Sequence, residues 1–100
     1  RIDKVKDYII SHYNENIEVG NLAGLLDLNP VYFSYYFKKC TGYTPKEYIN
    51  RIRVYKAQDL LTTGEYSVGE VASKCGFEDA LYFSRVFRKV TGIPPSSYLK

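Results

Sequence analysis

The chain contains one segment twice, and this internal repeat constrains the fold more than any single residue does. Residues 29–50 align without a gap with residues 79–100, and nine of the 22 aligned positions are identical. Further upstream, VGNLA at 19–23 is echoed by VGEVA at 68–72, but the offset is 49 residues instead of 50. The sequence therefore predicts two copies of a two-helix unit, with a turn that is one residue longer in the second copy. The identical pairs are Tyr32/Tyr82, Phe33/Phe83, Ser34/Ser84, Phe37/Phe87, Lys39/Lys89, Thr41/Thr91, Gly42/Gly92, Pro45/Pro95 and Tyr48/Tyr98.

Start and stop signals mark the helices of the first copy. Apolar residues recur at helical spacing over 2–14 and 19–26, which predicts two amphipathic helices. Asn29 is a suitable cap for a third helix, and Pro30 suits its first position because no amide hydrogen is needed there. Gly42 suits the left-handed residue that ends this helix.

A long helix is predicted to join the two copies. Thr44 and Glu47 form a capping box around Pro45, and the helical pattern then continues over 45–63 as far as Gly64. At about 1.5 Å per residue, this helix spans about 28 Å. The predicted linker is therefore a stiff rod and not a flexible tether.

The second copy repeats these signals, and the chain shows no alternating pattern typical of strands. Ser67 and Glu70 form another capping box, Gly76 suits the turn, and Asp79 suits the cap of the helix that follows. The predicted fold is all-α, a single domain over 1–100 with about seven helices. Lobe one covers 1–43, the linker helix 45–63 and lobe two 65–100, where helices are expected over 68–75, from Asp79 to Gly92, and from Pro95.

The spacing inside each copy is typical of a helix-turn-helix unit. In such units one helix braces a second helix that lies in the DNA major groove, and their close packing requires a small residue on the first. Ala23 and Ala72 supply that small residue. Gly76 lies where the turn requires a backbone angle that glycine reaches most easily, and Asp27 holds the equivalent position in the first copy. Because aspartate tolerates left-handed geometry better than most residues, we predict a positive φ at Asp27.

The second helix of each copy has two faces. One face carries apolar residues at i, i+3, i+4 and i+7 and is predicted to lie in the core. A solvated surface is the simplest explanation for the opposite face, but its recurrence in both copies and its apolar residues favour contact with DNA. The predicted core residues are Phe33, Tyr36, Phe37 and Cys40, then Phe83, Val86, Phe87 and Val90. The opposite faces carry Val31, Ser34, Tyr35 and Lys38, then Leu81, Ser84, Arg85 and Arg88.

On the faces opposite the predicted core, side-chain chemistry distinguishes candidate base-reading residues from candidate phosphate-binding residues. Arginine offers two parallel donors to O6 and N7 of guanine, so Arg85 is the first choice for base readout. Ser34 and Ser84 can donate or accept hydrogen bonds, while Val31 and Leu81 suit thymine methyl groups. Cations near the helix C-termini are better placed for phosphate groups or for interaction with the helix dipole. These cations are Lys38, Lys39, Arg88 and Lys89, and a solubilising charge is nearly as good an explanation for the lysines at 39 and 89.

The order of these residues resembles a known signature. The segment GFEDALYFSRVFRKVTGIPPSSY, following VGEVASKC, is similar to the signature of the AraC/XylS family of bacterial transcription regulators. The resemblance extends over nearly the whole chain, and in the linker helix it includes Arg53, Ala57, Leu60 and Leu61. It implies that two lobes enter successive major grooves on one side of double-stranded promoter DNA, about 34 Å apart. The implied base-reading residues are Val31, Ser34, Tyr35, Ala80, Leu81, Ser84 and Arg85, with Tyr82 as a backbone contact.

The resemblance also implies partners and a location. RNA polymerase at a promoter is an expected partner, the cytoplasm is the expected compartment, and a sensor or dimerisation domain is expected upstream. The start at Arg1, without methionine, also suggests a domain cut from a longer chain. Three positions depart from the family pattern: Tyr35 stands where many relatives carry arginine, Asp27 replaces the usual turn glycine, and Leu99 replaces a common arginine.

Other classes of function fit the sequence less well. An enzyme is not expected, because His12 has no matching nucleophile or acid cluster and a glycine-rich phosphate loop is absent. Cys40, Cys75 and His12 lack metal-ligand spacing, so no zinc or other cofactor is expected and both cysteines are predicted to be small core residues. The net charge of +3 is too mild to indicate a partner by itself. The main alternative is a helical protein–protein interaction module that buries the apolar part of the outer faces; RNA binding ranks third, since no stacking platform is evident.

Overall fold

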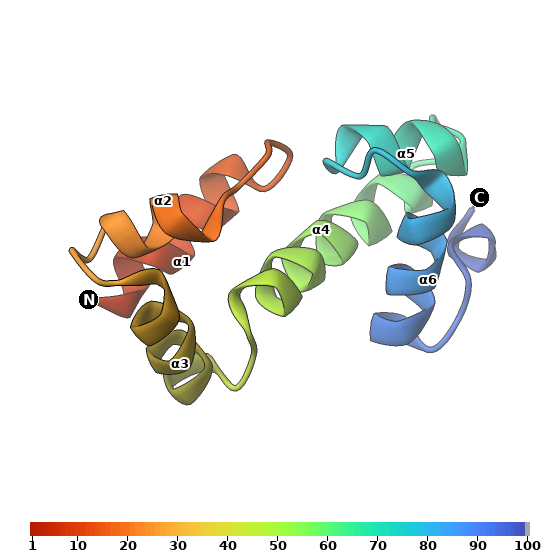
Figure 1. Cartoon of the computed structure of the whole chain (residues 1–100). Coiled ribbons are helices and arrows are strands. Elements are labelled where there is room, and N and C mark those ends of the chain that lie inside the picture. The colour runs from red at the N-terminus through yellow and green to blue at the C-terminus, as the bar shows by residue number, and fades with distance from the viewer. Residues whose placement is uncertain (100) are drawn as a thin grey trace. The chain divides into compact units, whose positions relative to one another are not determined.

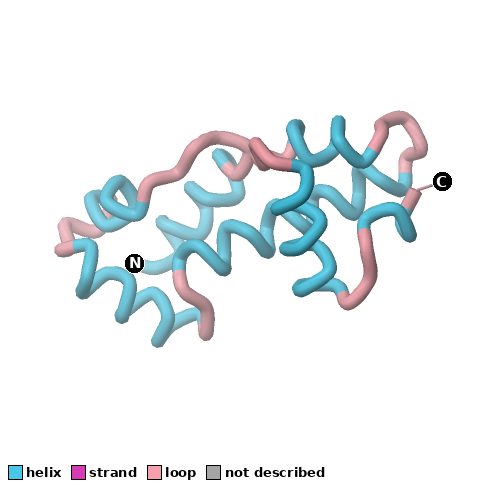
Figure 2. Tube along the Cα trace, turned by 45° about the vertical axis from the view of Figure 1, so that its right-hand side comes forward, coloured by secondary structure: helices cyan, strands magenta, loops and turns pink. Residues whose placement is uncertain are grey.

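The computed structural model describes residues 1–99, and those residues contain helices and no strand (Figures 1 and 2). The predicted all-α class is therefore confirmed for the described chain. The first two helices are shorter than the sequence predicted, and the last is a 3₁₀ helix. The elements are α1 (Ile2–His12), α2 (Val19–Gly24), α3 (Pro30–Thr41), α4 (Pro45–Thr62), α5 (Val68–Lys74), α6 (Ala80–Thr91) and the 3₁₀ helix η1 (Pro95–Tyr98).

The chain divides into two compact units, Arg1–Asn50 and Arg51–Lys100, and the division falls within α4. In the first unit α2 packs on α3, and in the second α5 packs on α6. Each unit thus contains one of the two helix pairs that the repeat predicts. The capping box at the start of α4 is also present, with Thr44 N donating to Glu47 Oε1 at 2.9 Å and Glu47 N donating to Thr44 Oγ1 at 3.2 Å.

The two units build their cores from the same positions of the repeat. Phe37 is fully buried, and the ring of Tyr48 meets its ring edge-on, with centroids 5.3 Å apart and planes at 86°. Phe87 is equally buried and meets Tyr98 at 5.3 Å and 81°. Several of the identical pairs therefore serve packing. The remaining fully or nearly fully buried residues of the helix pairs and of α1 are Val5, Ile9, Leu22, Ala23, Leu26, Phe33, Val71, Ala72, Cys75 and Phe83.

Four of the eight residues predicted for the core of these helices are not fully buried: Tyr36, Val86 and Val90 are half-buried, and Cys40 lies outside the core. Cys40 is exposed, whereas Val90, its counterpart in the second copy, is half-buried. Cys40 lies in the last turn of α3, beyond the fully buried Phe33 and Phe37, where the apolar spacing continues but burial does not. The prediction that Cys40 is a core residue is therefore wrong, while the same prediction for Cys75 is confirmed.

The turn inside each helix pair begins with the same backbone path. Asp27 has φ of 55° and Gly76 has φ of 93°, so the predicted positive φ at Asp27 is confirmed. The amide of Leu28 donates to the Ala23 carbonyl at 3.0 Å, and the amide of Phe77 donates to the Ala72 carbonyl at 2.9 Å. Since the helix caps at Asn29 and Asp79 again correspond, the extra residue of the second copy is Glu78.

We expect exchange of the two turn residues to change stability in opposite directions. Asp27→Gly relieves a side chain held in the left-handed region but adds chain entropy to the unfolded state, so the free energy of unfolding should rise by about 0.5 kcal/mol. Gly76→Asp should lower it by about the same amount. Urea unfolding followed by far-UV circular dichroism measures both. Equal destabilisation by the two variants would contradict the equivalence of the turns.

Candidate nucleic-acid interface

The same local interactions fix the ends of α3 and α6. The Asn29 side chain accepts from the Val31 amide at 2.8 Å, and the Asp79 side chain accepts from the Leu81 amide at 2.9 Å. At the other ends, Gly42 and Gly92 adopt φ of 85° and 87°. Because both helices contain twelve residues between equivalent caps, residues 50 apart in the sequence hold equivalent positions on the two helices.

A threonine in the last turn of each helix bonds backbone groups around the helix C-terminus. Thr41 Oγ1 donates to the Phe37 carbonyl at 2.9 Å and accepts from the Tyr43 amide at 3.1 Å. Thr91 Oγ1 donates to the Phe87 carbonyl at 2.8 Å. These bonds explain why threonine precedes glycine in both copies, since the hydroxyl satisfies backbone groups that the ending helix leaves without partners.

On α3, the predicted inner and outer faces are separated by burial. Phe33 and Phe37 are fully buried, whereas Val31 is 81% exposed and Tyr35 is 61% exposed. Ser34 is half-buried between these faces. An open hollow of about 460 Å³ on the outer face is lined by Ser34, Tyr35, Lys38 and Lys39. The structure therefore brings most of the predicted contact residues of the first copy together on one surface.

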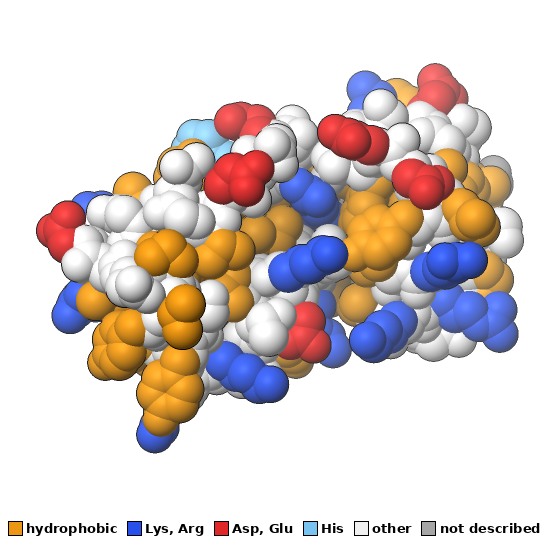
Figure 3. Space-filling view, in the orientation of Figure 1, with side chains coloured by type: hydrophobic (Ala, Val, Ile, Leu, Met, Phe, Trp, Pro, Cys, Tyr) orange, Lys and Arg blue, Asp and Glu red, His pale blue; other side chains and the backbone are white. Residues whose placement is uncertain are grey.

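The outer face of α6 has the same layout with a different chemistry. Leu81 is 62% exposed, Arg85 and Arg88 are exposed, and Ser84 is half-buried. Ala80 is exposed at the first position of the helix, and Lys89 is exposed in its last turn. Hydrophobic side chains gather over α3, whereas Lys and Arg side chains gather over α6 (Figure 3).

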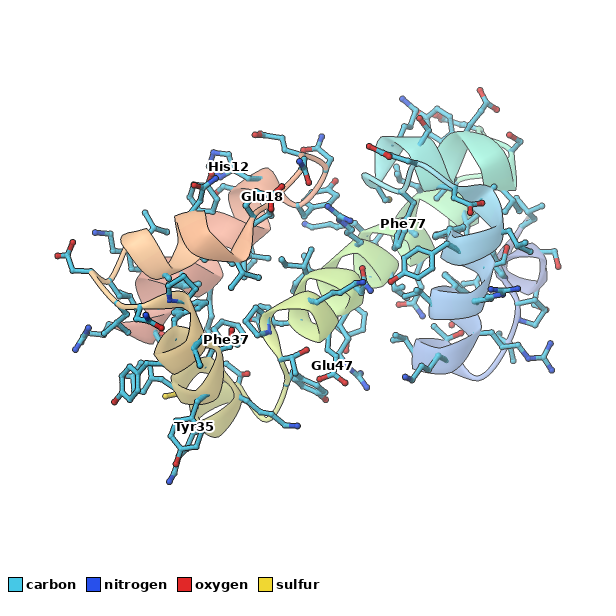
Figure 4. The ribbon with its side chains drawn as sticks, in the orientation of Figure 1. His12, Glu18, Tyr35, Phe37, Glu47 and Phe77 are labelled. Carbon is cyan, nitrogen blue, oxygen red and sulfur yellow. The ribbon has the colours of Figure 1, made fainter. Side chains whose placement is uncertain are left out.

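Tyr35 and Lys39 form a pair on the outer face of α3. The ammonium of Lys39 donates to the Tyr35 hydroxyl at 3.2 Å, and Nζ lies 5.4 Å from the centre of the Tyr35 ring. Tyr35 points away from the helix (Figure 4). The pair thus presents a ring and an adjacent positive charge at the end of the helix.

A contact that the sequence did not predict supports the start of α6. The guanidinium of Arg53 on α4 lies 5.5 Å from the centre of the Phe77 ring, and burial lowers the pKa of Arg53. Phe77, labelled in Figure 4, lies in the turn between α5 and α6. Its ring centroid is 6.1 Å from that of Tyr82. The Tyr82 ring therefore lies beside the Phe77 ring, tilted at 57° to it. No signal within either copy indicates this contact, because Arg53 lies 24 residues before Phe77 in the sequence.

His12 and Cys75, two further side chains of the described residues that could take part in chemistry, lie on elements other than α3 and α6. His12 stacks on Tyr8, with ring centroids 4.0 Å apart, at the end of α1. Burial raises the pKa of the Cys75 thiol to about 11. Residues 1–99 contain no group of three or more His, Cys, Asp or Glu side chains suited to a metal ion. Nor does any helix within them have the length and apolar character required to cross a membrane.

Comparison with known proteins gives the family of this chain. A family model described as a helix-turn-helix domain matches residues 22–100. The fold matches a probable AraC family transcriptional regulator from Rhodopseudomonas palustris, with a TM-score of 0.88 and 29% identity, over 95% of this chain and 90% of that one. The chain belongs to the AraC-type helix-turn-helix family of transcription regulators.

Two further proteins are also similar. The DNA-binding domain of AdpA, a global transcriptional factor, was solved in complex with a target DNA; it is 33% identical, with a TM-score of 0.88, over 96% of this chain and 86% of that chain. The transcriptional activator Btr of Bacillus subtilis is 36% identical over 99% of this chain. The chain spans only 19% of Btr and 29% of two other curated relatives. The chain therefore corresponds to only a part of these longer relatives.

Proposed function

We propose that this AraC-type domain binds double-stranded promoter DNA sequence-specifically, with α3 and α6 lying in two successive major grooves, whose centres are about 34 Å apart. The observation that carries the proposal is the duplicated helix with a fully buried phenylalanine pair on one face and exposed groups suited to DNA on the other. The relative solved with its target DNA supports the same use of the fold.

Comparison of equivalent positions in the two copies helps to distinguish residues suited to phosphate contacts from residues suited to base contacts. Phosphate groups are the same along every duplex, whereas base edges differ from site to site. The exposed pairs Tyr32/Tyr82 and Lys39/Lys89 are identical, which suits contacts to phosphate. The exposed pairs Val31/Leu81, Tyr35/Arg85 and Lys38/Arg88 differ. This difference suits an asymmetric site in which each lobe reads its own half.

The proposed contacts combine this comparison with side-chain chemistry. Lys38 and Arg88 differ, but both are cations in the last turn of a helix and suit phosphate. Ser34 and Ser84 are identical, but a hydroxyl can bond a base edge. Arg85 donates two hydrogen bonds to a guanine, and the serine of each helix bonds a base edge. The base-reading residues are Val31, Ser34, Tyr35, Ala80, Leu81, Ser84 and Arg85. The phosphate contacts are Lys38, Lys39, Tyr82, Arg88 and Lys89.

The proposal extends to the longer protein. Bound at a promoter, the domain regulates transcription initiation through RNA polymerase, and a sensor or dimerisation domain elsewhere in the full-length chain controls it. These partners follow from the family, in which transcriptional activators such as Btr occur. A cytoplasmic location follows from the same proposal, since bacterial promoters lie in the cytoplasm.

Selection of bound duplexes from a random DNA pool tests the proposal. Two half-sites whose centres are about 10 base pairs apart are expected, because two recognition helices on one side of the duplex read successive major grooves. Absence of any enriched sequence would contradict sequence-specific binding by this domain. Enrichment of one short half-site would contradict readout by both helices.

Arg85→Ala should lower specific affinity by about 1–3 kcal/mol, and it should relax the preference at one base pair. The loss is specific because the two parallel donors match guanine and no other base. Fluorescence anisotropy with the selected duplex and its three variants at that base pair measures both effects. An unchanged affinity with an unchanged preferred base would rule out base readout by Arg85.

A further inference from the structure

The outer faces of α3 and α6 differ most at one pair of equivalent residues. Tyr35 on α3 corresponds to Arg85 on α6. At this position α6 therefore carries a guanidinium group with several hydrogen-bond donors, whereas α3 carries an aromatic ring. Val31 lies one turn before Tyr35, and both are largely exposed. The part of α3 that leads into the groove is therefore mainly apolar.

The polar groups of α3 are poorly placed to read a guanine. Base contacts come mainly from the N-terminal residues of a recognition helix, and Lys38 and Lys39 lie in the last turn of α3. The hydroxyl of Tyr35 already accepts a hydrogen bond from Lys39. Ser34 is half-buried and has one hydroxyl, which cannot make the paired contact that an arginine makes with guanine.

We propose that α3 recognises its half-site through thymine C5-methyl groups, which pack on Val31 and Tyr35. The thymine methyl is the apolar group that the major groove offers to such side chains. The half-site of α6 is expected to contain both a thymine and a guanine contact, since Leu81 suits a methyl group and Arg85 suits a guanine. This inference rests on the proposed function and adds the base chemistry that distinguishes the two half-sites.

Cys40 provides the means to assign the half-sites. It is exposed at the end of α3, whereas Cys75 is buried and its pKa is raised to about 11, so an iron chelate couples selectively to Cys40. Cleavage of the selected duplex by this conjugate marks the half-site bound by α3. A conjugate on a Cys40→Ser variant with a cysteine in place of Ser96 serves as the control, because Ser96 is exposed in the second unit.

The test replaces single bases in the assigned half-sites. Exchange of thymine for deoxyuridine removes one methyl group, and in the α3 half-site each contacted methyl should cost about four-fold in affinity. Exchange of guanine for 7-deazaguanine, which lacks the N7 acceptor, should weaken binding in the α6 half-site and leave the α3 half-site unaffected. Deoxyuridine in the spacer between the half-sites is the matched control.

Two protein variants link the methyl effect to named side chains. Val31→Ala and Tyr35→Ala should each abolish discrimination between thymine and deoxyuridine at one position, which a merely structural role would not do. Tyr35→Phe should keep the discrimination, because the ring and not the hydroxyl makes the contact. Tyr35→Arg should shift the preferred base at its position toward guanine.

Equal binding of thymine and deoxyuridine throughout the α3 half-site would overturn the inference, even if the domain still selects a bipartite site. Weakening by 7-deazaguanine in that half-site would overturn it as well. A domain that selects no sequence at all would instead refute the proposed function. The two failures are therefore distinguishable.

Discussion

Replacement of Phe87 by alanine is expected to lower the free energy of unfolding of the second unit by about 3–5 kcal/mol. Phe87 is fully buried, its ring lies 5.7 Å from that of Phe83, and Tyr98 meets it edge-on. A unit of about 50 residues has a total stability of only a few kcal/mol. The second unit of this variant should therefore be largely unfolded at room temperature, with loss of the second half-site from its footprint.

Phe37 provides the matched variant in the other copy. It is fully buried, lies 5.7 Å from Phe33 and contacts Tyr48 edge-on. Phe37→Ala should therefore cost a similar amount but remove the first half-site. Ile93→Ala truncates an exposed apolar residue near α6 and should cost less than about 1 kcal/mol. Urea unfolding with hydroxyl-radical footprinting separates these outcomes, and loss of both half-sites in either phenylalanine variant would show that the units do not fold independently.

Local sequence signals predicted most of the helix boundaries correctly. Asn29, Gly42 and the capping box of Ser67 with Glu70 act on backbone groups within four residues, so the chemistry that fixes each helix end is visible in a short window. The positive φ at Asp27 was predictable for a related reason, since the repeat aligns it with Gly76. The duplication thus served as an internal comparison in place of related sequences.

Structural features that depend on distant parts of the chain could not be predicted from local sequence signals. Cys40 is exposed although it continues the apolar spacing of α3, because periodicity carries no information on whether a neighbouring element covers the last turn of a helix. The contact of Arg53 with Phe77 joins α4 to a turn beyond α5. The Tyr35–Lys39 hydrogen bond depends on side-chain orientation, although the spacing of four residues made the pair possible. The outer faces themselves were predictable because the buried stripes opposite them were clear.

We expect the affinity of the domain for its selected DNA to fall by about 100- to 1000-fold when salt rises from about 50 to about 200 mM. Each phosphate neutralised by a lysine or arginine releases counterions and contributes about −0.9 to the slope of log affinity against log salt. The four proposed cations Lys38, Lys39, Arg88 and Lys89 give a slope of about −3.6, and six phosphate contacts in all would give about −5. Equilibrium titrations at a series of salt concentrations measure this slope.

Single-charge variants test which cations contribute. Lys89→Ala should make the slope shallower by about 1 and should weaken binding to all sequences alike, because a phosphate contact carries no base information. Lys4→Ala is the matched control: it removes the same charge from an exposed position on α1, and it should leave the slope unchanged. A shallow slope for the unaltered domain would favour the alternative of a protein–protein interaction module, in which the exposed Val31, Tyr35 and Leu81 bury against a partner protein. A steep slope that depends on Lys89 and not on Lys4 requires a polyanion at the outer face of α6.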